Sequence, residues 1–306
     1  MKKRLVIAGG SGFIGSALAA EWLAQGGEAV VLTRSPRKRN DGAIEVQWNG
    51  VHIGEWIQYL NSAAAVVVLA GKNINCRHTP EAVRELAESR ISAVQTIAAA
   101  IAHVTKPPAV WVQASAIGFY GNRGDLILDE NSSNGEGTLS GICRQWESAF
   151  ESASVPRTRK ALLRIGVVLG REGGALPVLA RLTRWFLGGR AGNGKQFVSW
   201  VYLKDLTQMF RETIRREDLT GTYNATAPGP VTNGELMRQL RHALHRPWSP
   251  PAPGWAIKMG ARLMGTESSL ALDGCRVLPR RFAEAGFSFQ FPELKAALKD
   301  IFEPTR

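Results

Sequence analysis

Short apolar runs alternate along this chain with longer stretches in which apolar residues recur every three or four positions. Each apolar run is short enough for a strand, and the run at 63–70 is almost continuously apolar, as in a parallel strand that is covered on both faces. A helical period is clearest over 82–102. The predicted strands lie at 5–8, 28–33, 63–70, 110–114, 162–169 and 221–225.

Strands that alternate with helices imply right-handed crossovers and a parallel sheet. We therefore predict an α/β fold, with a Rossmann-like doubly wound sheet and a smaller C-terminal lobe on the substrate side. Residues 1–175 are expected to form the nucleotide-binding domain, and 196–228 to return to it. The smaller lobe is expected to comprise 176–195 and 229–306, because the chain after Gly170 is less regular and more basic.

A glycine-rich turn joins the first predicted strand to the first helix. It reads Gly9-Gly10-Ser11-Gly12-Phe13-Ile14-Gly15. Glycines at this spacing let the backbone approach a pyrophosphate, which then lies at the positive end of the helix. The alternative is a glycine turn that binds nothing. The strand and helix on either side favour a dinucleotide site.

The end of the second predicted strand distinguishes between two dinucleotides. An acidic residue at this place would hold the ribose hydroxyls of NAD, but the sequence reads Leu32-Thr33-Arg34-Ser35. Arg34 stands where the 2′-phosphate of NADP would lie, and a guanidinium pairs well with a phosphate. We therefore predict NADP(H) as the cofactor. The alternative is a loop of solvated basic residues, since Arg37, Lys38 and Arg39 follow.

Composition narrows the class of protein. Of the 306 residues, 44% are apolar, and no apolar run approaches a membrane span, so a globular protein without a membrane partner is expected. Three scattered cysteines suit a reducing compartment, and we expect a cytoplasmic protein without a metal site. The net charge of +12 fits nucleic acid, a membrane surface or an anionic small ligand. No nucleic-acid motif accompanies it, so we favour an anionic small-molecule substrate.

Several segments resemble a known family. The glycine turn together with Leu69-Ala70-Gly71 resembles the extended short-chain dehydrogenase/reductases, the group of the sugar-nucleotide epimerases. Further segments resemble the atypical YfcH-like "epimerase family" subgroup, including a C-terminal segment of unknown function. These segments are ESRI at 88–91, SAIGFYG at 115–121, CRQWE at 143–147, RIGVVLG at 164–170, GNGKQ at 192–196 and RVLPRR at 276–281.

The resemblance implies a set of cofactor contacts from four parts of the chain. The pyrophosphate turn, the adenosine phosphate site and the ribose site would come from the ends of three strands. Glu85 and Arg90 on the following helix would face the cofactor, and Val168 would lie beside the nicotinamide. The strand-end contacts would be Gly9, Ser11, Gly12, Phe13 and Ile14, then Thr33 and Arg34, then Leu69, Ala70 and Gly71.

The catalytic pattern of the family is missing. Hydride-transferring members use a Ser or Thr with Tyr-x-x-x-Lys, in which the tyrosine moves the proton. None of the four tyrosines here is followed by a lysine four positions later, and Cys143-x-x-x-Glu147 occupies that place. Ser115 is displaced by one position, because the usual hydroxyl position is Ala116. Ser115, Tyr120 and Cys143 are therefore the candidate substitutes.

Three functions remain open at this point. The first is an NADP(H)-binding oxidoreductase or epimerase-like enzyme of unknown substrate, in which Lys195, Arg164 and Arg280 are candidates to meet an anion. The second is a catalytically silent NADP(H)-binding sensor or partner-binding protein. The third is a nucleic-acid binder that uses the net positive charge. The substrate, the direction of hydride transfer and the oligomeric state cannot be inferred from these residues.

Overall fold

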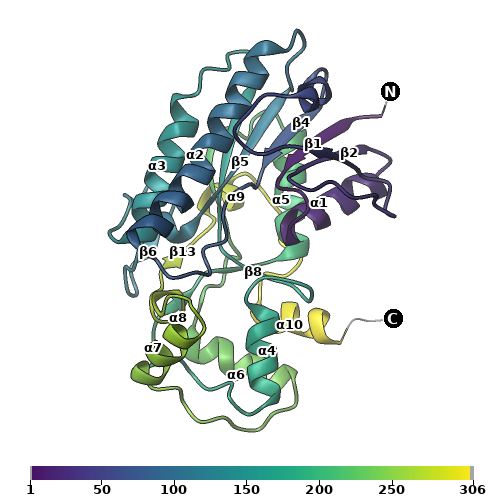
Figure 1. The fold of residues 1–306 in the computed structure, drawn as a ribbon. Helices are drawn as coiled ribbons and strands as arrows, with labels where there is room; N and C mark the ends of the chain where they lie inside the picture. Colours follow the sequence, from purple (N-terminus) through teal and green to yellow (C-terminus); the bar gives the residue numbers. More distant parts are fainter. Residues whose placement is uncertain (1, 304–306) are drawn as a thin grey trace.

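Seven parallel strands form the central sheet in the computed structural model, which describes residues 2–303 (Figure 1). The strand order is β11-β7-β5-β4-β1-β2-β3, so the order reverses between β1 and β4. This is a doubly wound sheet, and the predicted fold class is confirmed. The strands are β1 (Arg4–Ala8), β2 (Glu28–Thr33), β3 (Ile44–Gln47), β4 (Ala65–Val68), β5 (Val110–Ala116), β7 (Arg159–Ile165) and β11 (Gly221–Ala225).

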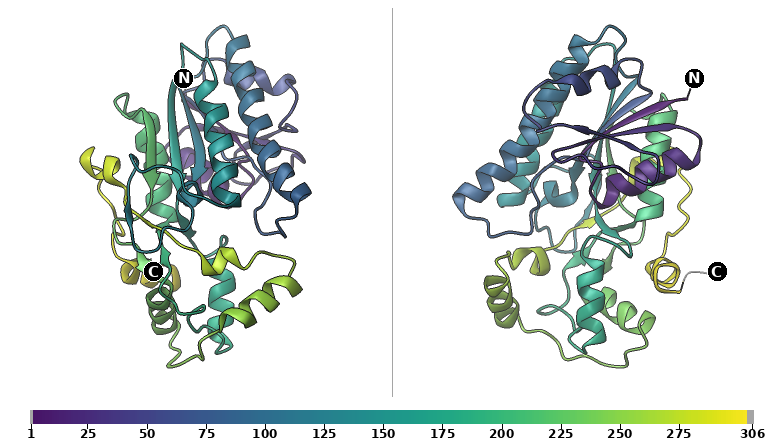
Figure 2. Two further views of the ribbon diagram at one scale, coloured as in Figure 1. Left: turned by 90° about the vertical axis from the view of Figure 1, so that its left-hand side faces the viewer. Right: turned by 45° about the vertical axis from the view of Figure 1, so that its right-hand side comes forward.

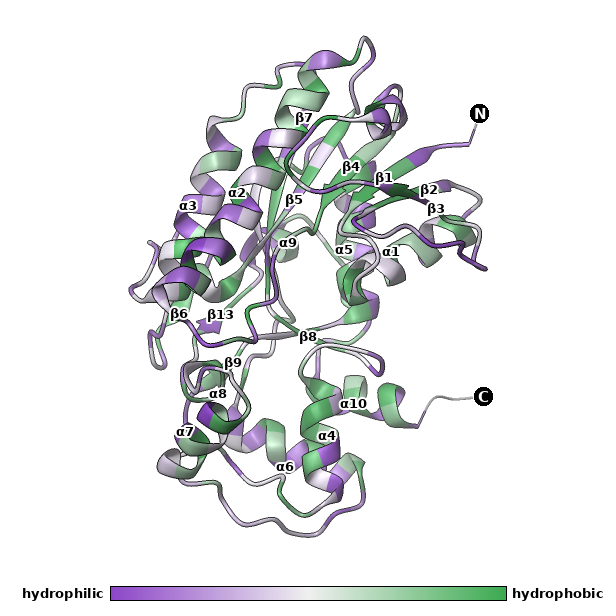
Figure 3. Ribbon diagram, in the orientation of Figure 1, coloured by the Kyte–Doolittle hydropathy of each residue, from purple (hydrophilic) through white to green (hydrophobic). Residues whose placement is uncertain are grey.

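Two pairs of helices cover the sheet, one pair on each face (Figure 1). Helices α1 (Phe13–Ala24) and α5 (Leu203–Arg215) pack together on one side, and α2 (Pro80–His103) and α3 (Thr138–Ser152) on the other. Strand residues such as Val6, Val30 and Val67 have no exposed surface. The central strands β1, β2 and β4 are accordingly apolar along most of their length, while the helices that cover the sheet also carry polar residues (Figure 3).

Helix α2 shows how local sequence sets an element boundary. Thr79 caps its first turn by accepting a hydrogen bond from the Ala82 amide, and Pro80 occupies the first helical position. Arg90 lies on the apolar stripe of this helix, which raises the question of its partner. Its guanidinium group lies against Gly71, after β4.

A smaller lobe lies at one end of the main domain (Figure 2). Its own apolar core contains Trp200, Leu236, Leu240 and Leu298. The lobe's helices are α4 (Leu176–Arg184), α6 (Asn233–Ala243), α7 (Gly254–Leu263), α8 (Ser269–Leu272) and α10 (Leu294–Phe302), and β9 (Phe197–Val198) pairs with β12 (Val231–Thr232). The remaining, shorter elements are β6 (Ile127–Leu128), β8 (Val167–Leu169), β10 (Trp200–Tyr202), β13 (Arg276–Val277), α9 (Arg280–Glu284), and the 3₁₀ turns η1 (Glu55–Leu60) and η2 (Ile117–Tyr120).

Two of the predicted strand assignments differ from the structure. The single strand expected over 162–169 is two strands, because the chain leaves the main sheet at Gly166, and β8 pairs with β10 instead. A Cβ atom on Gly166 would lie 2.6 Å from the Ser199 carbonyl oxygen, so this crossing requires glycine. Strand β3 was not predicted at all. Among residues 2–303, no helix has both the length and the apolarity to cross a bilayer.

Candidate functional site

The glycine turn lies at the carboxyl end of β1, where the strand order reverses. Gly9 adopts a φ of +80°, and a Cβ atom there would lie 2.9 Å from the Ala70 Cα atom after β4. A Cβ on Gly15 would lie 2.4 Å from Gly10 Cα, so this glycine lets α1 pack closely on the turn. Helix α1 has neither a side-chain cap nor an acidic residue in its first turn. Its first backbone N–H groups are therefore free for an anion.

A basic pocket of about 430 Å³ lies next to this turn, at the carboxyl end of β2. The Ser11 and Thr33 hydroxyls lie 3.3 Å apart at this pocket. The pocket is lined by Ser11, Thr33, Arg34, Ser35, Arg37, Arg39 and Glu45.

The three arginines of this pocket differ in whether a carboxylate pairs with them. Arg39 pairs with Asp41 at 2.5 Å and with Glu45 at 3.3 Å, and the pKa of the Asp41 carboxyl is lowered by the hydrogen bond from Arg39. The Arg37 backbone amide donates to the other Glu45 oxygen at 2.7 Å. Arg34 and Arg37 have no carboxylate partner among residues 2–303, so their guanidinium groups can receive a phosphate.

The carboxyl end of β4 brings together Gly71 and Arg90. A Cβ on Gly71 would lie 3.0 Å from the Arg90 guanidinium carbon. The guanidinium donates to the Leu86 carbonyl at 2.8 Å and lies over the Trp146 ring at 5.2 Å, and burial lowers the pKa of Arg90. No carboxylate pairs with it in the described part of the chain. Glu85, by contrast, is exposed and forms an ion pair with Lys72.

Phe13 and Val168 mark the boundary between the turn and the segment after β8. Hypothetical Cβ atoms on Gly170 and Gly173 would each lie 2.4 Å from the Phe13 ring. Phe13 thus packs on this glycine-rich segment and joins it to the start of α1. Val168 is half-buried in β8 and pairs with Val201. Both residues therefore lie at the edge of the sheet at which the glycine turn opens.

A buried ion pair occupies the place where the family's relay would lie. Glu147 stands on α3, one turn after Cys143, and pairs with Arg164 of β7 at 2.8 Å. Ser115 donates to Glu147 Oε1 at 2.6 Å. Arg164 also donates to the Tyr120 hydroxyl at 2.9 Å and lies 3.5 Å from the centre of the Phe119 ring. Each charge is therefore paired, as a buried charge must be.

The three candidate catalytic side chains differ in their hydrogen-bond partners and in the pKa of their ionisable groups. Tyr120 is fully buried, and its hydroxyl donates to Asn224 Oδ1 at 2.7 Å. Burial raises the pKa of Tyr120 to about 12. Burial, and then the charge of Glu147, raises the pKa of the Cys143 thiol to about 12 as well. Ser115 lies near the carboxyl end of β5, with Glu147 as its acceptor. Their roles in proton transfer stay predictions.

Sequence reasoning missed the pairing of Glu147 with Arg164, and of Tyr120 with Asn224. The unusual acid at the relay position was a signal, but its partner lies on another strand and no local spacing identifies it. Of the cations considered for an anionic substrate, Arg164 is buried in this pair. Arg280 pairs with Asp129 and Glu284, while Lys195 is exposed. No group of three His, Cys, Asp or Glu residues within 2–303 could hold a metal.

Two family models match the chain. Residues 5–225 match the NAD dependent epimerase/dehydratase family, and residues 252–301 match a domain of unknown function (DUF1731). The "Epimerase family protein SDR39U1 homolog, chloroplastic" of Arabidopsis thaliana is 36% identical, over 97% of this chain and 86% of that protein. The Bos taurus "Epimerase family protein SDR39U1" is 34% identical, over 97% of this chain and 99% of that protein.

Solved structures agree with this assignment. The human epimerase family protein SDR39U1 (isoform 2), crystallised with NADPH, superposes with a TM-score of 0.88 at 32% identity, covering 99% of this chain and 100% of that one. The nucleoside-diphosphate sugar epimerase from Corynebacterium glutamicum has a TM-score of 0.78 at 30% identity, over 99% of this chain and 58% of that one. The family resemblance seen in the sequence is thereby confirmed. The chain belongs to the NAD dependent epimerase/dehydratase family and carries the C-terminal DUF1731 domain.

Proposed function

We propose that this protein binds NADP(H) and acts as an oxidoreductase or epimerase-like enzyme on a small molecule. The single observation that carries the cofactor assignment is the pocket at the end of β2, which offers two arginines without carboxylate partners beside the glycine turn. A Cβ on Gly9 would collide with Ala70, so the turn is built for a close backbone approach. The human relative crystallised with NADPH supports the same choice.

The proposal assigns each contact to a part of the sheet edge. The free N–H groups at the start of α1 would hold the pyrophosphate. Arg34, Arg37 and the Ser11–Thr33 hydroxyl pair would hold the 2′-phosphate. Arg90 would donate its remaining N–H groups to the cofactor at the end of β4, which would supply the anionic partner that this half-buried cation lacks. Leu69, Ala70 and Val168 would contact the ribose and nicotinamide ends.

Replacing Arg34 by alanine tests the cofactor assignment. Losing a charge-assisted hydrogen bond costs about 1.5–3 kcal/mol, so the Kd for NADPH should rise by about tenfold or more. The Kd for NADH should stay unchanged, because NADH has no 2′-phosphate. Isothermal titration of both dinucleotides measures this difference. Lys38→Ala is the matched control, since Lys38 is an exposed cation of the same loop that does not line the pocket.

The proposal has a clear contrary outcome. An Arg34→Ala protein that binds NADPH as tightly as the original chain would contradict it. Equal losses of affinity for NADPH and NADH would contradict it as well, because they would indicate a general disturbance of the turn.

Among the three candidate catalytic residues, we place the proton-handling role on Ser115. It lies near the carboxyl end of β5, and its hydroxyl donates to Glu147, so it would accept a proton from the substrate as it passes its own proton to this carboxylate. Tyr120 already donates to Asn224 and accepts from Arg164, and Cys143 has a raised thiol pKa. These two residues would therefore position the network and not transfer a proton.

Hydride transfer to a panel of carbonyl compounds and nucleotide sugars tests this assignment. General acid–base catalysis contributes about 100- to 10,000-fold, so Ser115→Ala should lower kcat by about that factor with the Kd for NADPH unchanged. Tyr120→Phe should keep kcat within about tenfold, but lower the free energy of unfolding by about 1–3 kcal/mol, because it leaves buried partners unsatisfied. Unchanged turnover in Ser115→Ala would contradict the assignment.

One observation favours a second function, that of a silent NADP(H)-binding sensor. The place of the relay lysine is taken by Glu147, which is held by Arg164 in a closed network. A protein that binds NADPH but oxidises it with none of the tested substrates would support the sensor and exclude the enzyme on those substrate classes.

A further inference from the structure

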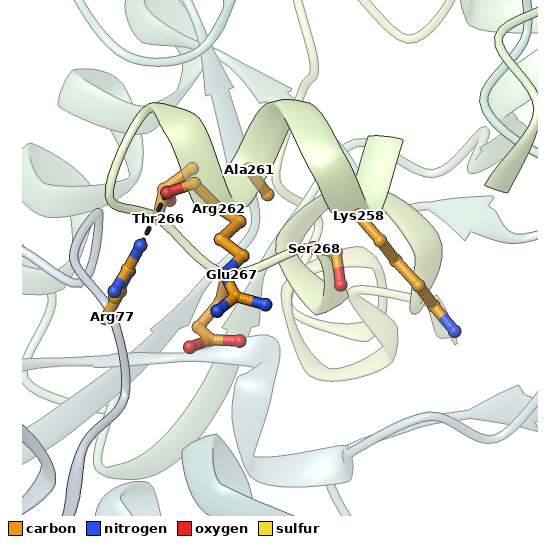
Figure 4. A pocket seen from close by; sticks show the side chains of 7 residues that line it. All are labelled: Arg77, Lys258, Ala261, Arg262, Thr266, Glu267 and Ser268. Carbon is orange, nitrogen blue, oxygen red and sulfur yellow. Dashed lines mark hydrogen bonds between the residues drawn. The ribbon is translucent and has the colours of Figure 1, made fainter. Parts of the chain in front are cut away.

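A second basic pocket lies where the main domain meets the smaller lobe (Figure 4). One wall is the loop that follows β4, at 71–79, and the other is the end of α7 with the residues after it. The volume is about 270 Å³. This pocket shares no residue with the basic pocket at the end of β2. Its lining consists of Arg77, Lys258, Ala261, Arg262, Thr266, Glu267 and Ser268.

Three hydrogen bonds connect the two walls of the pocket. Arg77 donates to the Arg262 carbonyl at 2.7 Å, drawn as a dashed line in Figure 4. The His78 amide donates to Glu267 Oε1 at 2.8 Å, and the Thr266 hydroxyl donates to Asn75 at 2.5 Å. The pocket is thus preformed, and a ligand would not have to order its walls.

The charge inside this pocket is unbalanced. Arg77, Lys258 and Arg262 carry three positive charges, against one carboxylate, Glu267. None of the three cations forms an ion pair with a carboxylate in the described part of the chain. The sequence contains no Asp or Glu from Leu236 to Thr266, so α7 brings no acid to this place. Such a cluster attracts an oxyanion.

We propose that this pocket binds the phosphate group of a phosphorylated small molecule. Two guanidinium groups, an ammonium group and the Ser268 hydroxyl offer more donors than the two oxygens of a carboxylate can accept. A phosphate presents three oxygens and up to two charges to them. The proposal concerns a second ligand and requires no turnover, so it does not rest on the proposed function.

The effect of replacing Glu267 on the affinity for phosphate tests the proposal. Its Oε1 accepts from the His78 amide, while its negative charge opposes an anionic ligand. In Glu267→Gln the amide oxygen can still accept from His78, but the like charge is gone. Removing an acid should therefore strengthen phosphate binding here, whereas a merely structural carboxylate would give no such gain.

Titration of the full chain with inorganic phosphate, followed by calorimetry, tests this inference. We expect saturable binding that weakens about tenfold or more in Lys258→Ala and in Arg262→Ala, and that tightens in Glu267→Gln. Arg262→Ala keeps the backbone carbonyl that Arg77 uses, and circular dichroism checks that each variant is folded. Lys299→Ala is the matched control, because Lys299 is an exposed cation on α10 that is remote from the lining residues.

Inorganic phosphate could also bind at the cofactor pocket, and the Arg34→Ala variant tells binding there from binding at the second pocket. If Arg34→Ala abolishes phosphate binding while Lys258→Ala and Arg262→Ala do not change it, the second site does not exist. Absence of saturable binding, or equal weakening in Lys299→Ala, would overturn the proposal too. Failure of the NADP(H) proposal is read separately, from the NADPH titration of Arg34→Ala.

Discussion

At the scale of single residues, the three cysteine thiols should differ sharply in reactivity. Cys76 is half-buried, whereas Cys143 and Cys275 are buried and burial raises the pKa of each thiol to about 12. At pH 8 a thiol with such a pKa is ionised in only about one molecule in ten thousand, and the thiolate is the nucleophile. A disulfide exchange reagent should therefore modify one thiol in the native protein and three in urea.

The control for this prediction is Cys76→Ser, which should show no rapidly reacting thiol in the native state. Rapid modification of Cys143 would instead mark it as a reactive residue.

The raised pKa of the Cys143 thiol also fixes the sign of its contribution to the pH dependence of stability. Since the pKa of Cys143 is raised from 9.0, its contribution to stability is fully present below pH 9 and is lost as the pH rises toward 12.

Single residues also show how far the sequence could predict the site. Arg34 and Arg39 lie in one basic run, and only the position of Arg34 directly after the second strand distinguishes it in the sequence. In the structure Arg39 is bound by Asp41 and Glu45, and Arg34 has no such partner within residues 2–303. Arg90 could be recognised as a cation on an apolar stripe, because helical spacing is local. The partners of Glu147 could not, because they come from β5 and β7.

At the scale of elements, the turn between β1 and α1 should tolerate no side chain at Gly9. Gly9 and Gly26 both have a φ of +80°, but a Cβ on Gly26 meets nothing within 4 Å. Gly26→Ala therefore measures the cost of the left-handed backbone alone, about 1–2 kcal/mol. Gly9→Ala adds the contact with Ala70 and should cost more in urea unfolding.

NADPH binding separates the two variants further. Gly9→Ala should raise the Kd for NADPH by at least tenfold, because the turn must shift away from the end of β4, whereas Gly26→Ala should leave the Kd unchanged. Equal stability and equal affinity of the two variants would refute a special role for the close approach of Gly9 to Ala70.

Elements also explain which parts of the fold were predictable. Strands of the sheet centre are apolar along their whole length, so β1, β2 and β4 are evident in the sequence. Strand β3 reads Ile44-Glu45-Val46-Gln47 and lies at the sheet edge, where an alternating pattern of four residues is too short to recognise. The break at Gly166 was hidden, because Leu162 to Leu169 is apolar almost throughout and only the crossing with Ser199 distinguishes the two strands.

At the scale of the whole molecule, the proposed cofactor site joins parts of the chain that no single element holds together. It draws on the ends of β1, β2 and β4 and on β8, which leads into the smaller lobe. A ligand that binds only the folded chain raises its free energy of unfolding by RT ln(1 + [L]/Kd). At a hundred times its Kd, NADPH should therefore stabilise the protein by about 2.7 kcal/mol against urea.

Comparing the stabilisation by NADPH with that by NADH tests whether the pocket selects the 2′-phosphate. NADH at the same concentration should stabilise the chain less than NADPH, because only the 2′-phosphate distinguishes the two dinucleotides at the end of β2. The difference should shrink in Arg34→Ala, in which Arg37 and the Ser11 and Thr33 hydroxyls remain. The unfolding midpoints for both ligands, measured in both proteins, form a closed cycle. Equal stabilisation of the original chain by NADH and NADPH would mean that Arg34 and Arg37 are solvated cations and that the pocket they line does not select a phosphate.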